Sequence, residues 1–394
     1  MRMAYASDVG DSGHKSVSLA IAEEGAARGH TCEEFALWPE DSVVARDVLF
    51  RMFREYAGRR LSGLPPVIEH PQLEPEMALD MLPGLSLPDV DVLIGVHPWA
   101  AYFFAELARR DGFDGPIIAV NTDFYEFPAL AHPRIDIYTG VFPKLILPPA
   151  DRARQRAIGM PVRSGFRRPG PPATERNLIV AAVGARPFIP LADVVAMCSA
   201  LQRRLPDVRV VVCAGREPAD SPPRTTPSNI EILHGATDLS DLMTKARLVI
   251  TRPSGATVAE TIAAGAVPAL LPSDVPWEAD AGRHLVWEGL AVPLPARAEA
   301  IVEAIEGLWA DDQRVGAIAG AGRRLELDRS AERLWELAEA GRPAPVEDPR
   351  ALLEPAEAEL LEGYLRTLDE AQRSDPMPRT AAILRRAMLD WYTG

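Results

Sequence analysis

Short runs of apolar residues alternate with helix-patterned segments over the first 150 residues of the chain. Uninterrupted apolar runs of about four to eight residues indicate buried strands, and apolar positions at helical spacing indicate helices. The expected strands are 1–7, 89–97, 115–123 and 135–142, and the expected helices are 15–29 and 99–113. Buried strands separated by helices are typical of a parallel sheet covered on both faces.

The same alternation returns in the second half, after a segment that is dense in Pro, Gly and Arg. The expected strands there are 177–184, 208–215, 229–235, 247–253 and 267–272, and the expected helices are 190–205, 239–246 and 257–265. From residue 296 onward the pattern is helical. Ligands of such sheets bind at the carboxyl ends of the strands.

We therefore predict an α/β protein with two doubly wound domains that face each other across a cleft. An N-terminal domain is expected at 1–158 and a hinge at 159–177. A second domain is expected at 178–335, and a C-terminal helical extension at 336–394.

Composition narrows the class of protein. The 394 residues are 47% hydrophobic and 25% charged, as in ordinary globular proteins, and the net charge is −14. An acidic chain argues against broad nucleic-acid binding, which needs a basic face. Because there is neither an apolar run of about 18 residues nor an apolar secretory leader, a cytoplasmic protein is expected. Cys32, Cys198 and Cys213 are too scattered for a disulfide framework or a zinc site, and no metal is expected.

Small and polar residues in the stretch SDVGDSGHK, residues 7–15, separate the first expected strand from the first expected helix. Glycines leave backbone N–H groups accessible, and the positive end of the helix dipole points at this loop. Asp11, Ser12 and Gly13 therefore form a candidate site for an anion or a developing negative charge, with His14 placed for general-base chemistry. The alternative is a helix start capped by Asp11 or Ser12, with an incidental histidine.

A second candidate is the stretch TRPSGATVAE, residues 251–260, which makes a tight turn after a strand. The first-turn amides and the dipole of the helix that follows suit a diphosphate. Glu260 could accept hydrogen bonds from a ribose diol, as acidic residues do in dinucleotide-binding folds. Its alternative role is only to complement the helix dipole. The other candidate donor-binding residues of this turn are Arg252, Ser254, Gly255, Ala256 and Thr257.

A third candidate follows the strand at 115–123. Asp123, Phe124 and Tyr125 stand at its carboxyl end, and a carboxylate with aromatic rings in this position suggests sugar or acceptor binding. The alternative is a loop whose aromatic rings pack against the domain core.

A fourth candidate is the expected loop at 273–284, which carries Trp277 and Glu278. A carboxylate beside an indole can hold sugar hydroxyls while the ring stacks on a pyranose face. The alternative is a solvated loop.

Residues 43–61 mix aromatic and aliphatic side chains with five arginines in an otherwise acidic chain. Such a basic, amphipathic segment can lie on an anionic membrane surface. The alternative is a helix that covers the N-terminal domain and exposes its arginines.

Taken in order, five segments resemble one branch of the GT-B glycosyltransferases. SDVGDSGHK is similar to that branch's S-D-T-G-G-G-H-R, and the segment around His97 is similar to its strand-His-Pro segment. GPIIAVNTDFYEFPALAHPRIDIY, GMPVRSGF and LVITRPSGATVAETIAAGAVPALL are similar to its Thr-Asp segment, its interdomain turn and its nucleotide-sugar loop. The branch contains monogalactosyldiacylglycerol synthases and processive diacylglycerol glucosyltransferases. The peptidoglycan lipid-II N-acetylglucosaminyltransferase is a more distant relative.

The resemblance implies a GT-B fold with two Rossmann-like domains, the N-terminal one (1–158) binding the acceptor and the second (178–335) binding the nucleotide sugar. It also implies an inverting, metal-independent hexosyltransferase that uses a UDP-sugar and no cofactor. His14 would be the general base or position the acceptor, with Asp123 as a second catalytic candidate. The acceptor side would be formed by Asp11, Ser12, Gly13, His97, Phe124 and Tyr125. Glu260 would hold the ribose, and residues 255–257 would lie along the diphosphate. Helix-end amides can stabilise the charge that the leaving UDP gains in an oxocarbenium-like transition state.

Three places depart from that branch. The first loop has Asp11 and Ser12 in place of glycines, and the turn after the first strand of the second domain keeps Gly184 but carries Arg186 near the expected diphosphate. Glu278, followed by alanine, stands where a Gln-Glu pair is expected. Galactose or glucose is therefore not carried over as the donor sugar.

A UDP-sugar-dependent glycosyltransferase is the leading hypothesis. Its acceptor would be a lipid or a small natural product, and its location cytoplasmic or peripheral on the inner face of the membrane. The alternatives are a sugar-nucleotide epimerase, which shares the two-domain cleft, and a catalytically silent UDP-sugar-binding protein.

Overall fold

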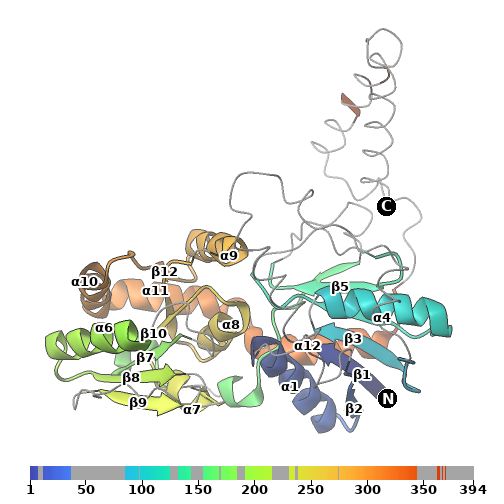
Figure 1. Ribbon diagram of the computed structural model, residues 1–394, viewed down its shortest axis with the longest axis horizontal. Helices are drawn as coiled ribbons and strands as arrows, with labels where there is room; N and C mark the ends of the chain where they lie inside the picture. Colours follow the sequence, from blue (N-terminus) through green and yellow to red (C-terminus); the bar gives the residue numbers. More distant parts are fainter. Residues whose placement is uncertain are drawn as a thin grey trace.

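The chain folds into two α/β domains that lie side by side (Figure 1). The computed structural model describes residues 1–7, 12–36, 85–96, 98–124, 132–142, 154–167, 170–183, 191–214, 230–235, 238–273, 275–343, 362, 363, 366 and 369. Each domain is built on a parallel sheet of six strands, with orders β2-β1-β3-β4-β5-β6 and β12-β11-β10-β7-β8-β9. The predicted pair of doubly wound domains is confirmed.

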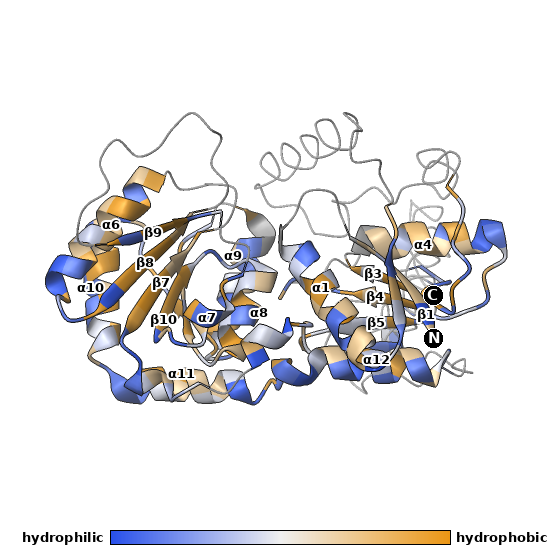
Figure 2. Cartoon of the chain, turned by 90° about the horizontal axis from the view of Figure 1, so that it is seen from below, coloured by the Kyte–Doolittle hydropathy of each residue, from blue (hydrophilic) through white to orange (hydrophobic). Residues whose placement is uncertain are grey.

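The N-terminal sheet is buried on both faces, as its apolar strands predict. Its elements are β1 (Arg2–Ser7), α1 (Ser12–Ala27), β2 (Thr31–Glu34), β3 (Val92–Val96), α4 (Pro98–Asp111), β4 (Ile117–Val120), β5 (Ile137–Gly140) and β6 (Gln155–Ala157). Helix α4 packs on one face of this sheet. Helix α1 covers the other face, where Ile21, Ile94 and Ile118 belong to one buried apolar cluster. The strands are apolar and the outward helix faces polar (Figure 2).

The second sheet is layered in the same way. Its elements are β7 (Leu178–Ala182), α6 (Leu191–Arg204), β8 (Arg209–Ala214), β9 (Glu231–His234), α7 (Ser240–Met243), β10 (Leu248–Thr251), α8 (Gly255–Ala263), β11 (Val267–Leu270), α9 (Pro276–Trp287), β12 (Val292–Pro293), α10 (Ala298–Trp309) and α11 (Asp312–Arg323). Helices α6, α10 and α11 cover one face of the sheet, and α7 packs on the other. The turn between β10 and α8 follows the carboxyl end of β10, so it lies at the carboxyl edge of the sheet.

The chain crosses between the domains twice. After the first crossing come η4 (Ser164–Arg167) and η5 (Ala173–Glu175), and the second leads through η6 (Leu327–Arg329) into α12 (Ser330–Ala340). The Ser330 hydroxyl contacts the Met160 carbonyl at 2.6 Å, which ties the two crossings together. The fully buried Trp335 donates its indole N–H to the Ile21 carbonyl at 2.9 Å, so α12 packs on the N-terminal domain.

The predicted boundary between residues 335 and 336 therefore falls inside one continuous helix. Helix α12 begins at Ser330 and ends at Ala340, and it belongs by its packing to the N-terminal domain. The pattern at 330–340 was helical in the sequence, but no local signal states which domain a helix covers. The predicted extension beyond residue 343 lies almost wholly outside the described residues.

Gly159, at the first crossing, is expected to tolerate no side chain. Its φ is +87°, and a Cβ there would stand 2.8 Å from Cδ2 of Leu327. Gly29 is the matched control because its φ is +78° but nothing lies within 4 Å of a Cβ. Gly29→Ala should cost about 1 kcal/mol from backbone strain alone, and Gly159→Ala at least about 2 kcal/mol. Urea unfolding followed by circular dichroism measures both, and equal losses would show that the Leu327 contact carries no weight.

A histidine and a glutamate are paired inside the N-terminal domain. Nε2 of His132 lies 2.8 Å from Oε1 of Glu106 on α4, and both side chains are buried. The backbone N–H of Arg134 donates to Nδ1 of His132 at 3.0 Å, so Nε2 carries the proton of the neutral ring and donates it to Glu106. Burial lowers the pKa of His132, although the hydrogen bond to Glu106 opposes that shift.

The free energy of unfolding is expected to fall as the pH drops below about 6.5, the ordinary pKa of histidine. Since the folded-state pKa of His132 is the lower one, the unfolded chain takes up this proton first, and the stability is lost between the two values. Melting temperatures between pH 8 and pH 5.5 measure the loss. His132→Gln should flatten the slope below pH 6.5, and identical slopes in both proteins would contradict the assignment.

Candidate functional site

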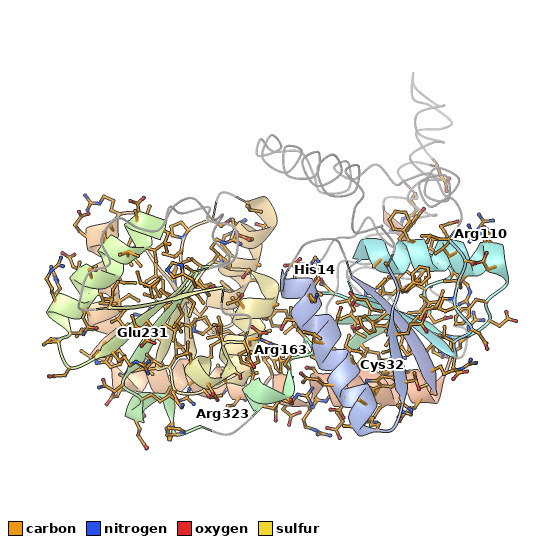
Figure 3. All side chains as sticks on the ribbon, turned by 60° about the horizontal axis from the view of Figure 1, so that its bottom comes forward. His14, Cys32, Arg110, Arg163, Glu231 and Arg323 are labelled. Carbon is orange, nitrogen blue, oxygen red and sulfur yellow. The ribbon has the colours of Figure 1, made fainter. Side chains whose placement is uncertain are left out.

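Helices α1 and α8 meet where the two domains adjoin, and they join the two sequence motifs that were expected to face each other (Figure 1). The hydroxyl of Ser16 on α1 donates to Oε1 of Glu260 on α8 at 2.5 Å, across 244 residues of sequence. His14 lies on the same helix, two residues before Ser16, and is partly buried. The structure therefore brings His14 and Glu260 to one boundary, where Figure 3 labels His14.

Arg163 stands beside Glu260 at this boundary. It follows the first crossing, in the stretch GMPVR, and its side chain is only 14% exposed. Its Nη2 lies 3.6 Å from Oε1 of Glu260 and 3.7 Å from Oδ1 of Asp238, and its guanidinium lies over the ring of Phe166. Figure 3 labels it between the two domains. One cation is thus shared by two carboxylates of the second domain.

Glu260 is the most enclosed carboxylate of this group, with 8% of its surface exposed. Burial raises its pKa, while the hydrogen bond from Ser16 and the charge of Arg163 act in the opposite direction. A buried carboxylate needs hydrogen-bond donors when it is ionised. Glu260 can therefore bind hydroxyl groups strongly if a ligand supplies them in place of the solvent it has lost.

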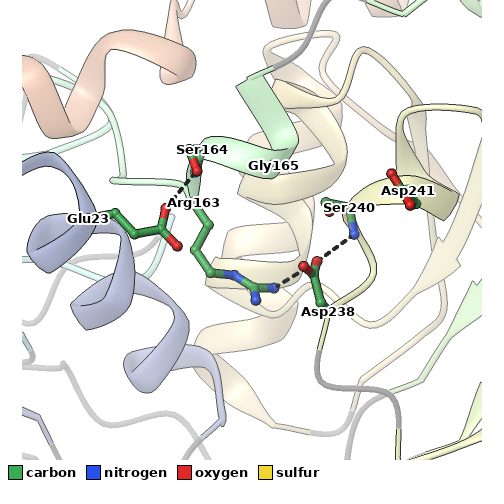
Figure 4. A pocket seen from close by; sticks show the side chains of 7 residues that line it. All are labelled: Glu23, Arg163, Ser164, Gly165, Asp238, Ser240 and Asp241. Atoms are coloured by element: carbon green, nitrogen blue, oxygen red, sulfur yellow. Dashed lines mark hydrogen bonds and ion pairs between the residues drawn. The ribbon is translucent and has the colours of Figure 1, made fainter. Parts of the chain in front are cut away.

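A polar cavity of about 300 Å³ opens beside Arg163. Its lining residues are Glu23, Arg163, Ser164, Gly165, Asp238, Ser240 and Asp241, from α1, η4 and the start of α7 (Figure 4). Glu23 accepts a hydrogen bond from the Ser164 N–H, and Asp238 accepts one from the Ser240 N–H, both at 2.9 Å. Because Arg163 lines the cavity and also lies beside Glu260, the cavity adjoins the candidate ribose site.

The first turn of α8 abuts the N-terminal domain. A Cβ built on Gly255 would stand 1.7 Å from the Thr122 carbonyl oxygen and 3.1 Å from Cα of Asp123. Only glycine permits this approach. Ser254 precedes the helix and makes no side-chain capping bond to it. The loop after β4 and the diphosphate candidate, which were predicted separately, thus touch each other.

Phe124 is a core residue, as the packing alternative expects. It is 5% exposed and its ring lies 6.2 Å from that of Phe142. Asp123 is partly buried, and its N–H donates to the Asn121 side chain at 3.0 Å.

Glu278 lies in a helix, so the prediction of a loop at this position is wrong. Pro276 occupies the first turn of α9, where its missing N–H and fixed φ suit a helix start. The Glu278 carboxylate is 7% exposed and accepts from Nη1 of Arg252 at 2.9 and 3.2 Å and from the Ser273 hydroxyl at 2.5 Å. Two predicted donor-site residues thus bind each other and fix α9 beside the turn that begins α8.

Several candidates lie outside the described residues. These are Asp11, His97, Tyr125, Gly184, Arg186 and the segment 43–61. The side chains of Ser12 and Trp277 are likewise outside them. Their assignments stay predictions.

Sequence reasoning missed Ser16, Arg163 and Asp238. Arg163 stands in a hinge between two domains, which was a usable signal, because hinge side chains reach the boundary that the domains share. Ser16 carried no such signal, since it is one small polar residue in a helix and its partner is far away in sequence.

Metal and membrane features can be stated for the described ranges only. Within them no cluster of three or more His, Cys, Asp or Glu side chains could hold a metal ion. None of the helices described there combines the length and the apolar character needed to span a bilayer.

Known proteins give two kinds of likeness. No protein-family model matches the chain. A processive diacylglycerol beta-glucosyltransferase of Bacillus pumilus is 24% identical over 270 residues, which are 64% of this chain and 69% of that protein. A counterpart from Bacillus licheniformis is 25% identical over 272 residues, with the same coverage.

Solved structures share the arrangement of the two domains. The glycosyltransferase of kitacinnamycin superimposes with a TM-score of 0.56 at 18% identity, covering 86% of this chain and 98% of that one. Acinetobacter baumannii MurG superimposes with a TM-score of 0.53 at 14% identity, covering 86% and 99%. At these identities the likeness speaks for the fold alone.

Proposed function

We propose that the chain is a GT-B glycosyltransferase, distantly homologous to the processive diacylglycerol glucosyltransferases, and that it moves a hexose from a UDP-sugar to a hydroxyl acceptor with inversion. The reaction would take place at the boundary of the two domains. The observation that carries this proposal is the buried carboxylate of Glu260 on α8, which faces the His14-bearing helix α1.

Glu260 and the cavity beside it would hold the nucleoside. The carboxylate would accept hydrogen bonds from the two ribose hydroxyls, and the base would enter the cavity lined by Arg163 and Asp238. Backbone N–H groups at the start of α8 would meet the diphosphate, because the first turn of a helix has unpaired donors and a positive dipole end. Since the charge on the diphosphate grows as the sugar leaves, these donors would stabilise the transition state.

His14 would take the proton from the acceptor hydroxyl. The bond between the acceptor oxygen and the anomeric carbon forms as the bond from that carbon to the diphosphate breaks. A single displacement of this kind inverts the configuration at the anomeric carbon. Asp123 is the second candidate for this step. Its Cα lies 3.1 Å from a Cβ built on Gly255, so it stands beside the turn that would hold the leaving diphosphate.

The acceptor would be a lipid or a small natural product. The Bacillus relatives carry diacylglycerol in their names, which favours a lipid hydroxyl, and the structural neighbours include an enzyme named for the natural product kitacinnamycin. A lipid acceptor would agree with the predicted membrane contact of residues 43–61. Vesicles containing anionic lipid and diacylglycerol, compared with soluble aglycones, would separate these two classes.

The test is UDP release from a panel of UDP-sugars, with and without each acceptor, followed by mass spectrometry of the product. We expect release to require an acceptor and the product to gain one hexose. UDP should also raise the melting temperature. A changed sugar nucleotide without transfer would favour the epimerase, and a raised melting temperature without turnover would favour the silent binder.

A further inference from the structure

We infer that the Ser16 hydroxyl acts as a latch. By its hydrogen bond to Glu260 it holds the two domains in a closed arrangement that excludes the donor. This inference rests on the proposed function, because it takes Glu260 as the ribose ligand. Two contacts between the domains carry it, one at the carboxylate and one at the first turn of α8.

The first contact gives the Glu260 carboxylate its hydrogen-bond donor in the absence of a ligand. The Ser16 hydroxyl lies 2.5 Å from Oε1, and Arg163 faces the same oxygen from 3.6 Å. This is the kind of donor that a ribose hydroxyl would supply, on a carboxylate with only 8% of the residue exposed. A ribose diol bound through both carboxylate oxygens would therefore compete with Ser16 for its place.

The second contact covers the diphosphate candidate. The Thr122 carbonyl oxygen occupies the space of a Cβ on Gly255, the first residue of α8, since a Cβ built there would stand 1.7 Å from it. A carbonyl oxygen bears partial negative charge, so it both fills the space in front of this turn and repels a phosphate. The donor diphosphate can reach the first-turn amides only when the Thr122 loop has moved away.

Both contacts join the same two domains, so they break together when the domains separate. The chain crossings near Gly159 and Ser330 are tied by the bond from Ser330 to the Met160 carbonyl, and they provide the pivot. The donor then binds only the open fraction of the molecules. Its apparent affinity is lowered by that fraction, and weakening the latch restores it.

Ser16→Ala tests this inference, with Ser18→Ala as the matched control on the same helix. Ser18 is 2% exposed, and its hydroxyl has no hydrogen-bond partner among the described residues. Isothermal titration with UDP measures the affinity of each protein. We expect Ser16→Ala to bind UDP roughly threefold to tenfold more tightly than the wild type, while Ser18→Ala and the hydroxyl-retaining Ser16→Thr bind as the wild type does.

Small-angle X-ray scattering without ligand gives a second measurement, which a merely local role would not affect. The radius of gyration of Ser16→Ala should exceed that of Ser18→Ala, and saturating UDP should bring the wild type toward the Ser16→Ala value. If wild type and Ser16→Ala bind UDP equally, or the variant binds more weakly, the latch is wrong while the proposed function stands. If none of the proteins binds UDP, the UDP-sugar proposal itself is wrong.

Discussion

His14→Ala is expected to lower kcat by about 10²- to 10⁴-fold while the Kd for UDP stays within about twofold of the wild type. His14 lies in the first turn of α1, at the boundary where this helix meets Glu260. If it removes the acceptor proton, its loss affects the chemical step and not the nucleotide. Initial rates of UDP release at saturating donor and acceptor, with isothermal titration of UDP, measure the two quantities separately.

Two further variants sharpen the assignment. His14→Gln keeps a hydrogen-bonding group but cannot take up the proton, so it should be as slow as alanine. His234→Ala changes an exposed histidine on the edge strand β9 and should leave the rate unchanged. Near-normal turnover of His14→Gln would reduce His14 to a positioning role, and normal turnover of His14→Ala would remove it from the reaction.

Glu260→Gln is expected to weaken UDP binding by roughly tenfold to a hundredfold, because hydrogen bonds to a charged group contribute about 1.5–3 kcal/mol. The amide is nearly the same size as the carboxylate, but it is neutral and exposes one acceptor oxygen. The comparison of UDP with 2′,3′-dideoxy-UDP isolates the ribose contact. The wild type should distinguish these two ligands, and the variant should bind them alike.

Glu24→Gln is the matched control for this experiment. Glu24 on α1 accepts from Arg167 of η4 at 2.8 Å, so it is a carboxylate of the same helix in a salt bridge to the hinge segment. Its loss should leave the UDP affinity unchanged. Equal discrimination against the dideoxy ligand in wild type and Glu260→Gln would contradict the ribose assignment, whatever the change in overall affinity.

Most of the predicted strands are buried on both faces of their sheet, although the edge strand β9, which is partly exposed, was also predicted. Strands β3, β7 and β10 have every residue buried and appear in the sequence as uninterrupted apolar runs. The unpredicted strands β2, β6 and β12 are short, lie near or at sheet edges and expose part of their residues. Their sequences contain no uninterrupted apolar run. Pairing with neighbouring strands, and not their own composition, makes these residues strands.

The candidate site was predictable in its motifs but not in its contacts. A strand, a glycine-containing turn and a helix predicted a helix start near Thr257, two residues after the observed start of α8 at Gly255, and the same local signals indicated the start of α1. Contacts such as Ser16–Glu260 and Arg252–Glu278 depend on how the domains and turns pack, which no local pattern encodes. Pro276 began a helix where polar residues had suggested a loop.

The packing of α12 against the N-terminal domain has a consequence for chimeras between this protein and its relatives. Trp335, near the end of the described chain, fills the hydrophobic interior beside Ile21, near its beginning. A chimera spliced once, at the hinge, would set a tryptophan from one parent against a helix from the other. Exchanging the N-terminal domain therefore requires two junctions, so that α12 is transferred together with the residues it covers.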